Sequence, residues 1–140
     1  MSGFRESLKD SPEYRAVLTA VQKRRLPLGV LGLSAIHKAH IADALCAALR
    51  KRALIVMPDE ASATKLTEDL NTLGMSALLY PEREFVFHTA TETRSHEYEQ
   101  RRLNALTAML AGNVQAVVCA VSAAMQYTVP PEELQKRACT

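Results

Sequence analysis

The sequence contains no long hydrophobic run and no apolar leader. None of its apolar stretches approaches the roughly 20 residues that a helix needs to cross a bilayer. The opening stretch, MSGFRESLKDSPEYR, is polar and charged, which is unlike a secretory signal. We therefore expect a cytoplasmic protein that has no membrane partner.

Cysteine is also scarce. Cys46, Cys119 and Cys139 are the three cysteines, and no two of them have CxxC spacing. The four histidines do not cluster with them at the spacing of metal ligands. We expect no metal site, and we expect Cys46 and Cys119 to be small core residues in a reducing compartment.

A strong charge of either sign is absent as well. The chain has 17 basic and 15 acidic residues and a net charge of +2, which is too mild to indicate a nucleic-acid surface. Direct DNA binding is therefore only weakly supported. The 140 residues, nearly half of them hydrophobic, suit one domain with a single core.

Periodicity and punctuation predict alternating helices and strands. Helices are expected over 11–25, from about 34 to 52, from Asp59 to Gly74, from about 95 to Gly112, and briefly from a cap at Ser122. Short apolar runs predict strands at 26–33, 53–57, 76–80 and 114–121.

This alternation predicts a doubly wound α/β fold. Strands that are continuously apolar are buried on both faces, so we expect a mainly parallel sheet of at least four strands with helices on both faces. The domain is expected to span 1–127, with an N-terminal helix at 11–25 and a core at 28–127. Residues 128–140, which include Pro130-Pro131, are expected to begin a linker.

The stretch GLSAIHKAH, residues 32–40, is close to a phosphate-binding loop, G-x-x-x-x-G-K-[ST]. Gly32 and Lys38 are in register. In a working loop, the second glycine lets backbone N–H groups approach the phosphate, and the Ser or Thr hydroxyl holds magnesium. Here His37 stands in place of that glycine, and Ala39 stands in place of the hydroxyl residue. We expect an ordinary strand-to-helix turn that binds no nucleotide, with weak anion binding at the helix N-terminus as the alternative.

Two further stretches are candidates for contact with another domain. Arg94, Arg101 and Arg102 lie among glutamates near the start of the long helix, where they form either a solvated face or a contact surface. Phe85 and Phe87 lie in an expected loop, where they either tuck under the sheet edge or meet a partner domain. No local motif marks a catalytic triad or dyad.

Taken together, these segments resemble a known family. GLSAIHKAHIADAL, LIVMPDEASATKLTEDLNTLG, YPEREFVFHTATETRSHEYEQRRLNAL and VQAVVCAVSAAMQYTVPPEEL resemble, in this order, the N-terminal, UvrB-like domain of bacterial transcription-repair coupling factors. The resemblance covers about 28–134. It implies a P-loop NTPase or helicase-like (RecA-like) half without a working phosphate loop. Residues 81–94 are too few for the damage-engaging hairpin of the excinuclease protein UvrB.

The resemblance implies a non-catalytic role in transcription-coupled nucleotide excision repair. In the family, the whole protein is an ATP-dependent DNA translocase that displaces stalled RNA polymerase and recruits the excinuclease through UvrA. ATP and magnesium act in a motor whose residues have no counterparts here. We therefore expect no catalytic residue, cofactor or metal in this chain, and contacts mainly with neighbouring domains. The alternative is a nucleotide-binding domain of a helicase-like ATPase that uses Lys38.

Overall fold

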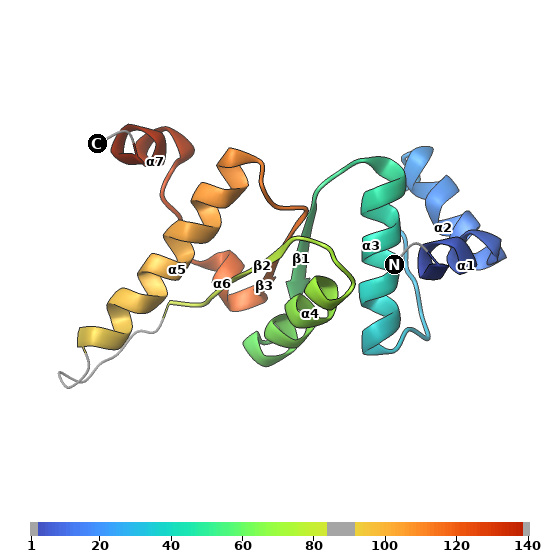
Figure 1. The fold of residues 1–140 in the computed structure, drawn as a ribbon, viewed down its shortest axis with the longest axis horizontal. Coiled ribbons are helices and arrows are strands. Elements are labelled where there is room, and N and C mark those ends of the chain that lie inside the picture. Colours follow the sequence, from blue (N-terminus) through green and yellow to red (C-terminus); the bar gives the residue numbers. More distant parts are fainter. Residues whose placement is uncertain (1–2, 84–91, 139–140) are drawn as a thin grey trace.

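The fold is built around a short parallel sheet that carries helices on both faces (Figure 1). A computed structural model describes residues 3–83 and 92–138, with side chains for 5–83 and 99–136. The helices are α1 (Gly3–Asp10), α2 (Pro12–Gln22), α3 (Ala35–Leu49), α4 (Glu60–Thr72), α5 (Glu92–Ala111), α6 (Val121–Met125) and α7 (Pro131–Ala138). The strands are β1 (Ala53–Met57), β2 (Ala77–Tyr80) and β3 (Ala116–Ala120).

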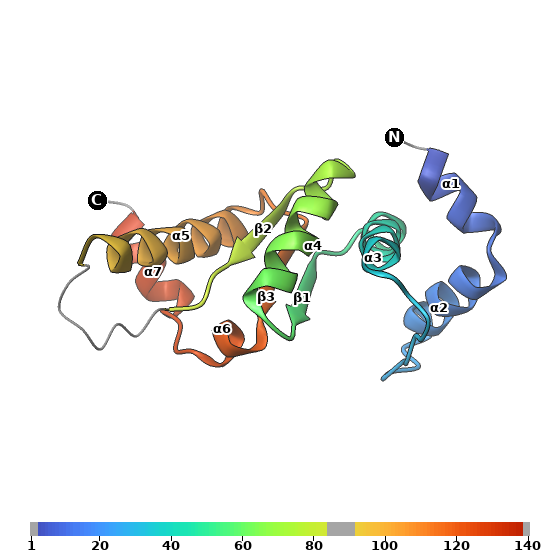
Figure 2. The same ribbon diagram turned by 90° about the horizontal axis from the view of Figure 1, so that it is seen from below.

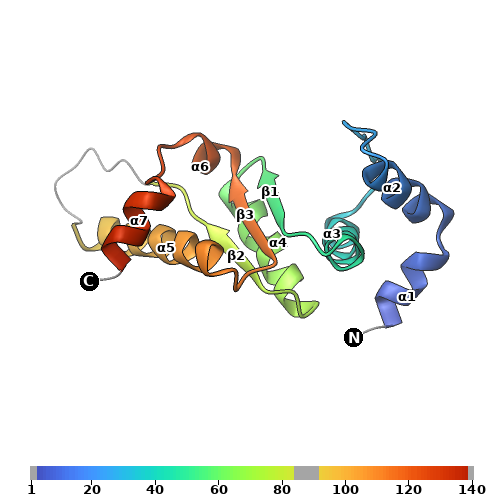
Figure 3. The same ribbon diagram turned by 90° about the horizontal axis from the view of Figure 1, so that it is seen from above.

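The strand order is β1-β3-β2, and both pairings are parallel. The chain moves from β1 past β3 to β2 through α4, and it returns to β3 through α5. Because parallel crossovers are right-handed, steps in opposite directions put their helices on opposite faces. Figures 2 and 3 show this arrangement, with α4 on one side of the sheet and α5 on the other.

The central strand β3 supplies the core of both faces, and all five of its residues are buried. Val118 faces a cluster formed with Leu66 and Leu70 of α4, whereas Val117 and Cys119 face a cluster that includes α5 and α6. For β3, this alternation confirms the expectation that an entirely apolar strand is covered on both sides.

The outer strand β1 departs from that expectation. Ile55 and Met57 pack against the α4 side, but Leu54 is 66% exposed and Val56 is 46% exposed on the other face. The continuous apolar sequence of β1 predicted burial on both faces, and this prediction is wrong because the short helix α6, which contacts β1, leaves Leu54 and Val56 exposed.

Several predicted elements are confirmed with their boundaries. β1 occupies the predicted residues 53–57, and α4 starts after its cap Asp59. Gly74 has a φ of +84° just beyond the end of α4, a left-handed conformation that glycine adopts without steric cost. The long helix ends at Ala111, directly before the expected Gly112, although it begins at Glu92 rather than near residue 95.

The strand predicted at residues 26–33 is absent. These residues lie in the described part of the chain and form no strand, so the sheet formed by the described residues has three strands instead of at least four. Leu26, Leu28, Val30 and Leu31 are exposed. A short apolar run does not by itself specify a strand, and Pro27, Gly29 and Gly32 all disfavour one.

Three smaller features differ from the elements expected from the sequence. The short helix α6 begins at Val121 with Ala120 as its N-cap residue, so Ser122 lies inside it and is not its cap. Part of the expected linker is helical, because Pro131 suits the first helical position and Glu132 and Glu133 favour the positive end of the helix dipole. The polar residues before Ser11 form α1, which was not predicted.

The molecule is elongated, with α1 and α2 at one end and α7 at the other (Figure 1). The first two helices attach to α3 on its side away from the sheet (Figure 3). Arg5 of α1 donates two hydrogen bonds of 2.7 and 2.6 Å to the buried carboxylate of Asp43 in α3. Within the described residues, no helix combines the length and apolar character needed to cross a membrane.

Candidate functional site

The N-terminus of α3 holds the residues of the degenerate phosphate loop. Gly32 has a φ of +80°, and Ser34 occupies the N-cap position in an extended conformation. The Ser34 hydroxyl makes no capping hydrogen bond. It lies 3.1 Å from Nδ1 of His37 instead, and His37 is exposed. The imidazole of His37 therefore lies at the start of α3, in the position of the second glycine. A bound phosphate would need accessible backbone N–H groups there.

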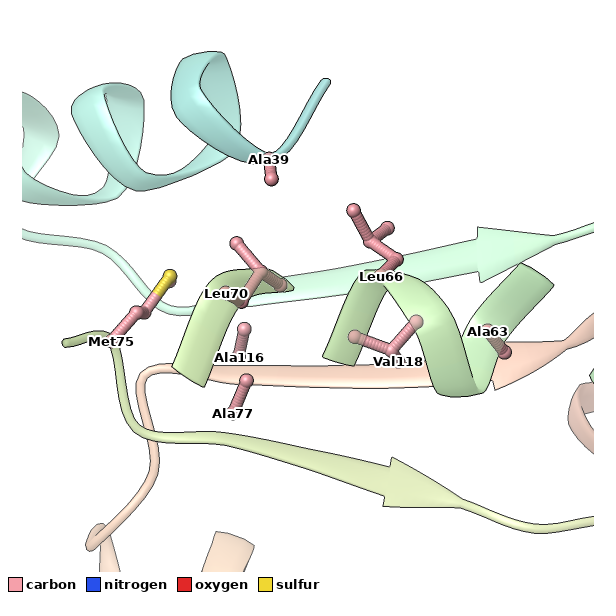
Figure 4. Close-up of a cluster of buried hydrophobic side chains, with 8 residues drawn as sticks. All are labelled: Ala39, Ala63, Leu66, Leu70, Met75, Ala77, Ala116 and Val118. Atoms are coloured by element: carbon pink, nitrogen blue, oxygen red, sulfur yellow. The ribbon is translucent and has the colours of Figure 1, made fainter. Parts of the chain in front are cut away.

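Ala39 is a packing residue. Its side chain is 0% exposed and belongs to the cluster that joins α3 to Leu66 and Leu70 of α4. Figure 4 shows its methyl group directed at these leucines. A hydroxyl at this position would enter an apolar helix–helix contact, not a metal site. Ala39, at the position where a phosphate loop has its hydroxyl, thus takes part in the close packing of two helices.

Lys38 is exposed beside a small hollow of about 150 Å³ between α3, α4 and the carboxyl end of β1. Met57, Ser62, Lys65 and Asp69 share its lining. Ligand pockets usually have volumes of about 300–1,000 Å³, so this hollow is smaller than a typical ligand site. The Asp69 carboxylate in the lining also opposes the binding of an anion beside Lys38.

Asp59, at the carboxyl end of β1, acts as a helix cap. Its carboxylate accepts hydrogen bonds from the backbone N–H of Ser62 at 2.8 Å and from the Ser62 hydroxyl at 3.1 Å. These bonds, the backbone one first, lower the pKa of Asp59 below its ordinary value. The prediction that Asp59 caps the helix is confirmed.

A second polar group of residues lies at the carboxyl ends of β2 and β3, centred on Arg102 of α5. Arg102 is only 6% exposed. Its Nη1 donates to the carbonyl of Pro81 at 2.7 Å and to the side-chain oxygen of Gln126 at 3.0 Å. Its guanidinium lies 4.1 Å from the centre of the Tyr80 ring, a distance that allows a cation–π interaction. Its Nη2 is buried without a hydrogen-bond partner.

Further bonds extend this group. Gln126 also accepts from the backbone N–H of Arg83 at 2.7 Å, Arg83 pairs with Glu99 at 2.7 Å, and Ser122 donates to Glu82 at 2.9 Å. The Tyr80 and Thr128 hydroxyls lie 2.9 Å apart. We call this set the carboxyl-edge network: Tyr80, Pro81, Glu82, Arg83, Glu99, Arg102, Ser122, Gln126 and Thr128. Its bonds fasten the end of β2 to α5 and to the chain that follows α6.

The predicted contact residues lie in different places. Phe85 and Phe87 fall outside the described residues, as does the side chain of Arg94. Arg101 is exposed on α5, whereas Arg102 is buried and bonded within the chain. The structure therefore does not place Arg101 and Arg102 on one surface, and Arg102 serves the interior.

The carboxyl-edge network was not predicted from the sequence. A helical period would have indicated the role of Arg102, because Ala105 and Met109 follow it by three and seven residues on the face that packs on the sheet. Gln126 and Pro81 gave no comparable signal, since they contact Arg102 from loops. The pairing of Arg5 with Asp43 was equally unpredictable, because the residues are distant in sequence.

The two described cysteines are free, as expected. Cys119 is buried and Cys46 is partly buried, and burial raises the pKa of both thiols. Within the described part of the chain, no three His, Cys, Asp or Glu residues are arranged to hold a metal ion.

We also compared the chain with known proteins. No protein-family model, no curated protein and no solved structure matches it.

Proposed function

We propose that the chain is a non-catalytic α/β domain with a structural and regulatory role, similar to the first domain of transcription-repair coupling factors. Two kinds of observation support this proposal. The sequence contains, in the same order, four segments that resemble those of this family. The fold is a parallel sheet with helices on both faces. In that role, the domain packs on neighbouring domains, helps to hold the full protein in a repressed state, and takes part in transcription-coupled nucleotide excision repair.

The observation that carries the proposal is the burial of Ala39. In a working phosphate loop, the residue after the lysine turns a hydroxyl toward magnesium. Here its methyl group is 0% exposed and packs against Leu66 and Leu70. The geometry of α3 relative to α4 therefore favours a fold element that has lost its nucleotide chemistry.

The finer fold assignment, a helicase-like (RecA-like) half, is part of the proposal. It is supported by the strand order β1-β3-β2 and by the crossovers on opposite faces, which are typical of doubly wound sheets. RNA polymerase, the excinuclease protein UvrA and DNA are partners of the family, and we propose that this domain binds none of them tightly. ATP and magnesium would act elsewhere in such a protein.

Thermal unfolding with ATP and magnesium tests the absence of nucleotide binding. A ligand at 100 times its dissociation constant stabilises a protein by about 2.7 kcal/mol, which raises the melting temperature by several degrees. We expect no rise. Lys38→Ala is the matched control, because a rise that persists in this variant does not come from the degenerate loop.

The second candidate function is nucleotide binding through Lys38, in a helicase-like ATPase. It is favoured by the hollow at the carboxyl end of β1, where Lys38, Lys65 and Ser62 meet. A melting-temperature rise that is present in the wild type and lost in Lys38→Ala would establish this function and overturn our proposal.

The regulatory role has a positive test. A coupling factor that lacks its first domain can be assayed for DNA binding with and without this chain added in trans. We expect the added chain to weaken DNA binding by the truncated factor. An unchanged affinity at saturating amounts of the chain would contradict the regulatory part of the proposal.

A further inference from the structure

The outer edge of β1 has backbone groups available for another strand. Among the described strands, β1 pairs with β3 alone. The N–H of Ala53 donates to Gln115 at 2.9 Å, so alternate residues starting with Ala53 turn their backbone groups toward β3. The N–H and C=O groups of Leu54 and Val56 therefore point away from the sheet, in the direction from which a further strand would pair.

Within β1, this edge has no charged residue, no proline and no bulge. Sheet edges are commonly protected by charged residues, proline or a bulge within the strand. The sequence of β1 is ALIVM, and its register with β3 is regular along all five residues. The exposed side chains of Leu54 and Val56 make this edge apolar as well as unpaired.

Apolar surface continues from β1 on the face opposite α4. At the amino-terminal end of the strand, Leu54, Met109 and Val117 line a hollow of about 240 Å³. At the carboxyl end, α6 contacts β1 and exposes Val121 and Met125. An added strand would therefore find apolar contacts for its side chains along the length of β1.

The residues that flank β1 carry opposite charges at its two ends. Arg50, Lys51 and Arg52 precede the strand and are exposed, and Asp59 and Glu60 follow it. An antiparallel partner strand places its own first residues beside the acidic end and its last residues beside the basic end. Antiparallel pairing is slightly more stable per residue than parallel pairing. For an antiparallel segment, charge complementarity then favours basic residues at its start and acidic residues at its end.

We propose that the outer edge of β1 binds an extended segment of a partner protein by antiparallel strand addition. The segment has a middle of about five residues in which the alternate side chains beside Leu54 and Val56 are apolar, a basic amino-terminal end and an acidic carboxyl-terminal end. Its backbone bonds to Leu54 and Val56, and its side chains pack beside them. This inference does not depend on the proposed coupling-factor role.

A lone segment fits this edge better than a second copy of the chain. Antiparallel pairing of two copies into one sheet relates them by a two-fold axis perpendicular to the sheet, so both copies keep their helices on the same side of it. α3 packs on α4 and lies next to β1 on its outer side, so it is close to the seam (Figure 3). Two α3 helices would then compete for the same space.

The test uses the peptide Lys-Lys-Thr-Val-Thr-Val-Thr-Glu-Glu, acetylated and amidated, titrated into the whole chain and followed by ¹H–¹⁵N NMR. In the expected register, its two valines lie opposite Val56 and Leu54 and turn their N–H groups toward β1. We expect the largest shifts at β1. N-methylation of both valines should weaken binding at least tenfold, whereas N-methylation of the outer threonines should leave binding nearly unchanged.

Three results would overturn the proposal. The first is equal binding by the two N-methylated peptides, and the second is equal binding by a peptide with its charged ends exchanged. The third is a sedimentation result in which the free chain is a dimer and the Val56→Pro variant is a monomer. Such a result would mean that the edge of β1 binds a second copy of the chain. The peptide pair requires no change to the protein, so the outcome does not depend on whether a variant folds.

Discussion

At the scale of single residues, burial decides what a charged or polar group does here. Arg101 and Arg102 are neighbours in sequence, yet only Arg102 enters the interior, where a carbonyl, an amide and an aromatic ring hold it. Asp59 lies at a strand end, where it could have served as a metal ligand, and caps α4 instead. The role of Asp59 follows from its local sequence, because its partner Ser62 is three residues away, whereas the role of Arg102 depends on distant partners that the fold brings within bonding distance.

Replacing Arg102 tests whether the carboxyl-edge network stabilises the fold. Arg102→Met removes the donor to the buried Pro81 carbonyl and to Gln126, so we expect a loss of about 1–3 kcal/mol in the free energy of unfolding. Urea denaturation measures it. Arg101→Met on the exposed side is the control and should change stability by about 0.5 kcal/mol or less. Equal losses in the two variants would contradict the assigned role.

The Asp59 cap predicts a pH dependence. The pKa of Asp59 is lower in the folded chain than in the unfolded one, so its carboxylate stabilises the fold fully above the ordinary aspartate pKa of about 3.9. That contribution is lost as the pH falls through the lowered folded-state value. Asp59→Asn keeps a capping group that does not titrate. The difference in melting temperature between wild type and variant should therefore shrink in acid, and a constant difference would argue against the cap.

At the scale of elements, the sequence predicted structure best where several local signals agreed. β1 and α4 have a strand-length apolar run, a capping aspartate and a terminal glycine, and both formed as expected. Residues 26–33 have only an apolar run interrupted by Pro27 and two glycines, and they formed no strand. The expected strand-to-helix turn at residues 32–39 is wrong, because no strand precedes α3 in the described residues, and the absence of nucleotide binding there stays a prediction. The packing of Ala39 was not predicted, because it depends on how α3 meets α4.

That packing gives a prediction at the scale of two helices. Ala39→Leu adds volume where α3 touches Leu66 and Leu70, so we expect a loss of about 1–3 kcal/mol in unfolding free energy. Ala47→Leu, on the exposed side of the same helix, is the matched control and should cost about 0.5 kcal/mol or less. Urea denaturation followed by circular dichroism compares them. An Ala39→Leu variant as stable as the control would mean that α3 and α4 pack loosely.

At the scale of the whole molecule, β3 belongs to the core on both faces of the sheet, whereas α1 and α2 pack on each other and on α3. In α2, Tyr14 is the only residue that is fully buried. Segments with few buried contacts open locally at a small cost in free energy, whereas core strands open only with global unfolding. The sheet and the N-terminal helix pair should therefore differ in stability.

Hydrogen exchange tests this difference. We expect the amides of β3 to exchange most slowly and those of α1 and α2 to exchange at least roughly tenfold faster. Arg5→Met should speed exchange in α1 and α2 further, because it leaves the Asp43 carboxylate without its guanidinium partner, and should leave β3 unchanged. Equal protection of α2 and β3 would show instead that the whole chain opens as one unit.

Alanine supplies half of the buried cluster on the α4 face, at positions 39, 63, 77 and 116. Side chains this small let the helix layer and the sheet approach closely, and they leave little volume that a mutation could delete. We therefore expect this face to tolerate smaller side chains at these positions better than larger ones. In a library of single substitutions, replacements that enlarge these alanines should be eliminated more strictly than replacements by glycine. The short distance between the helix layer and the sheet, more than the strength of any one contact, would then determine which residues are compatible with the fold at these positions.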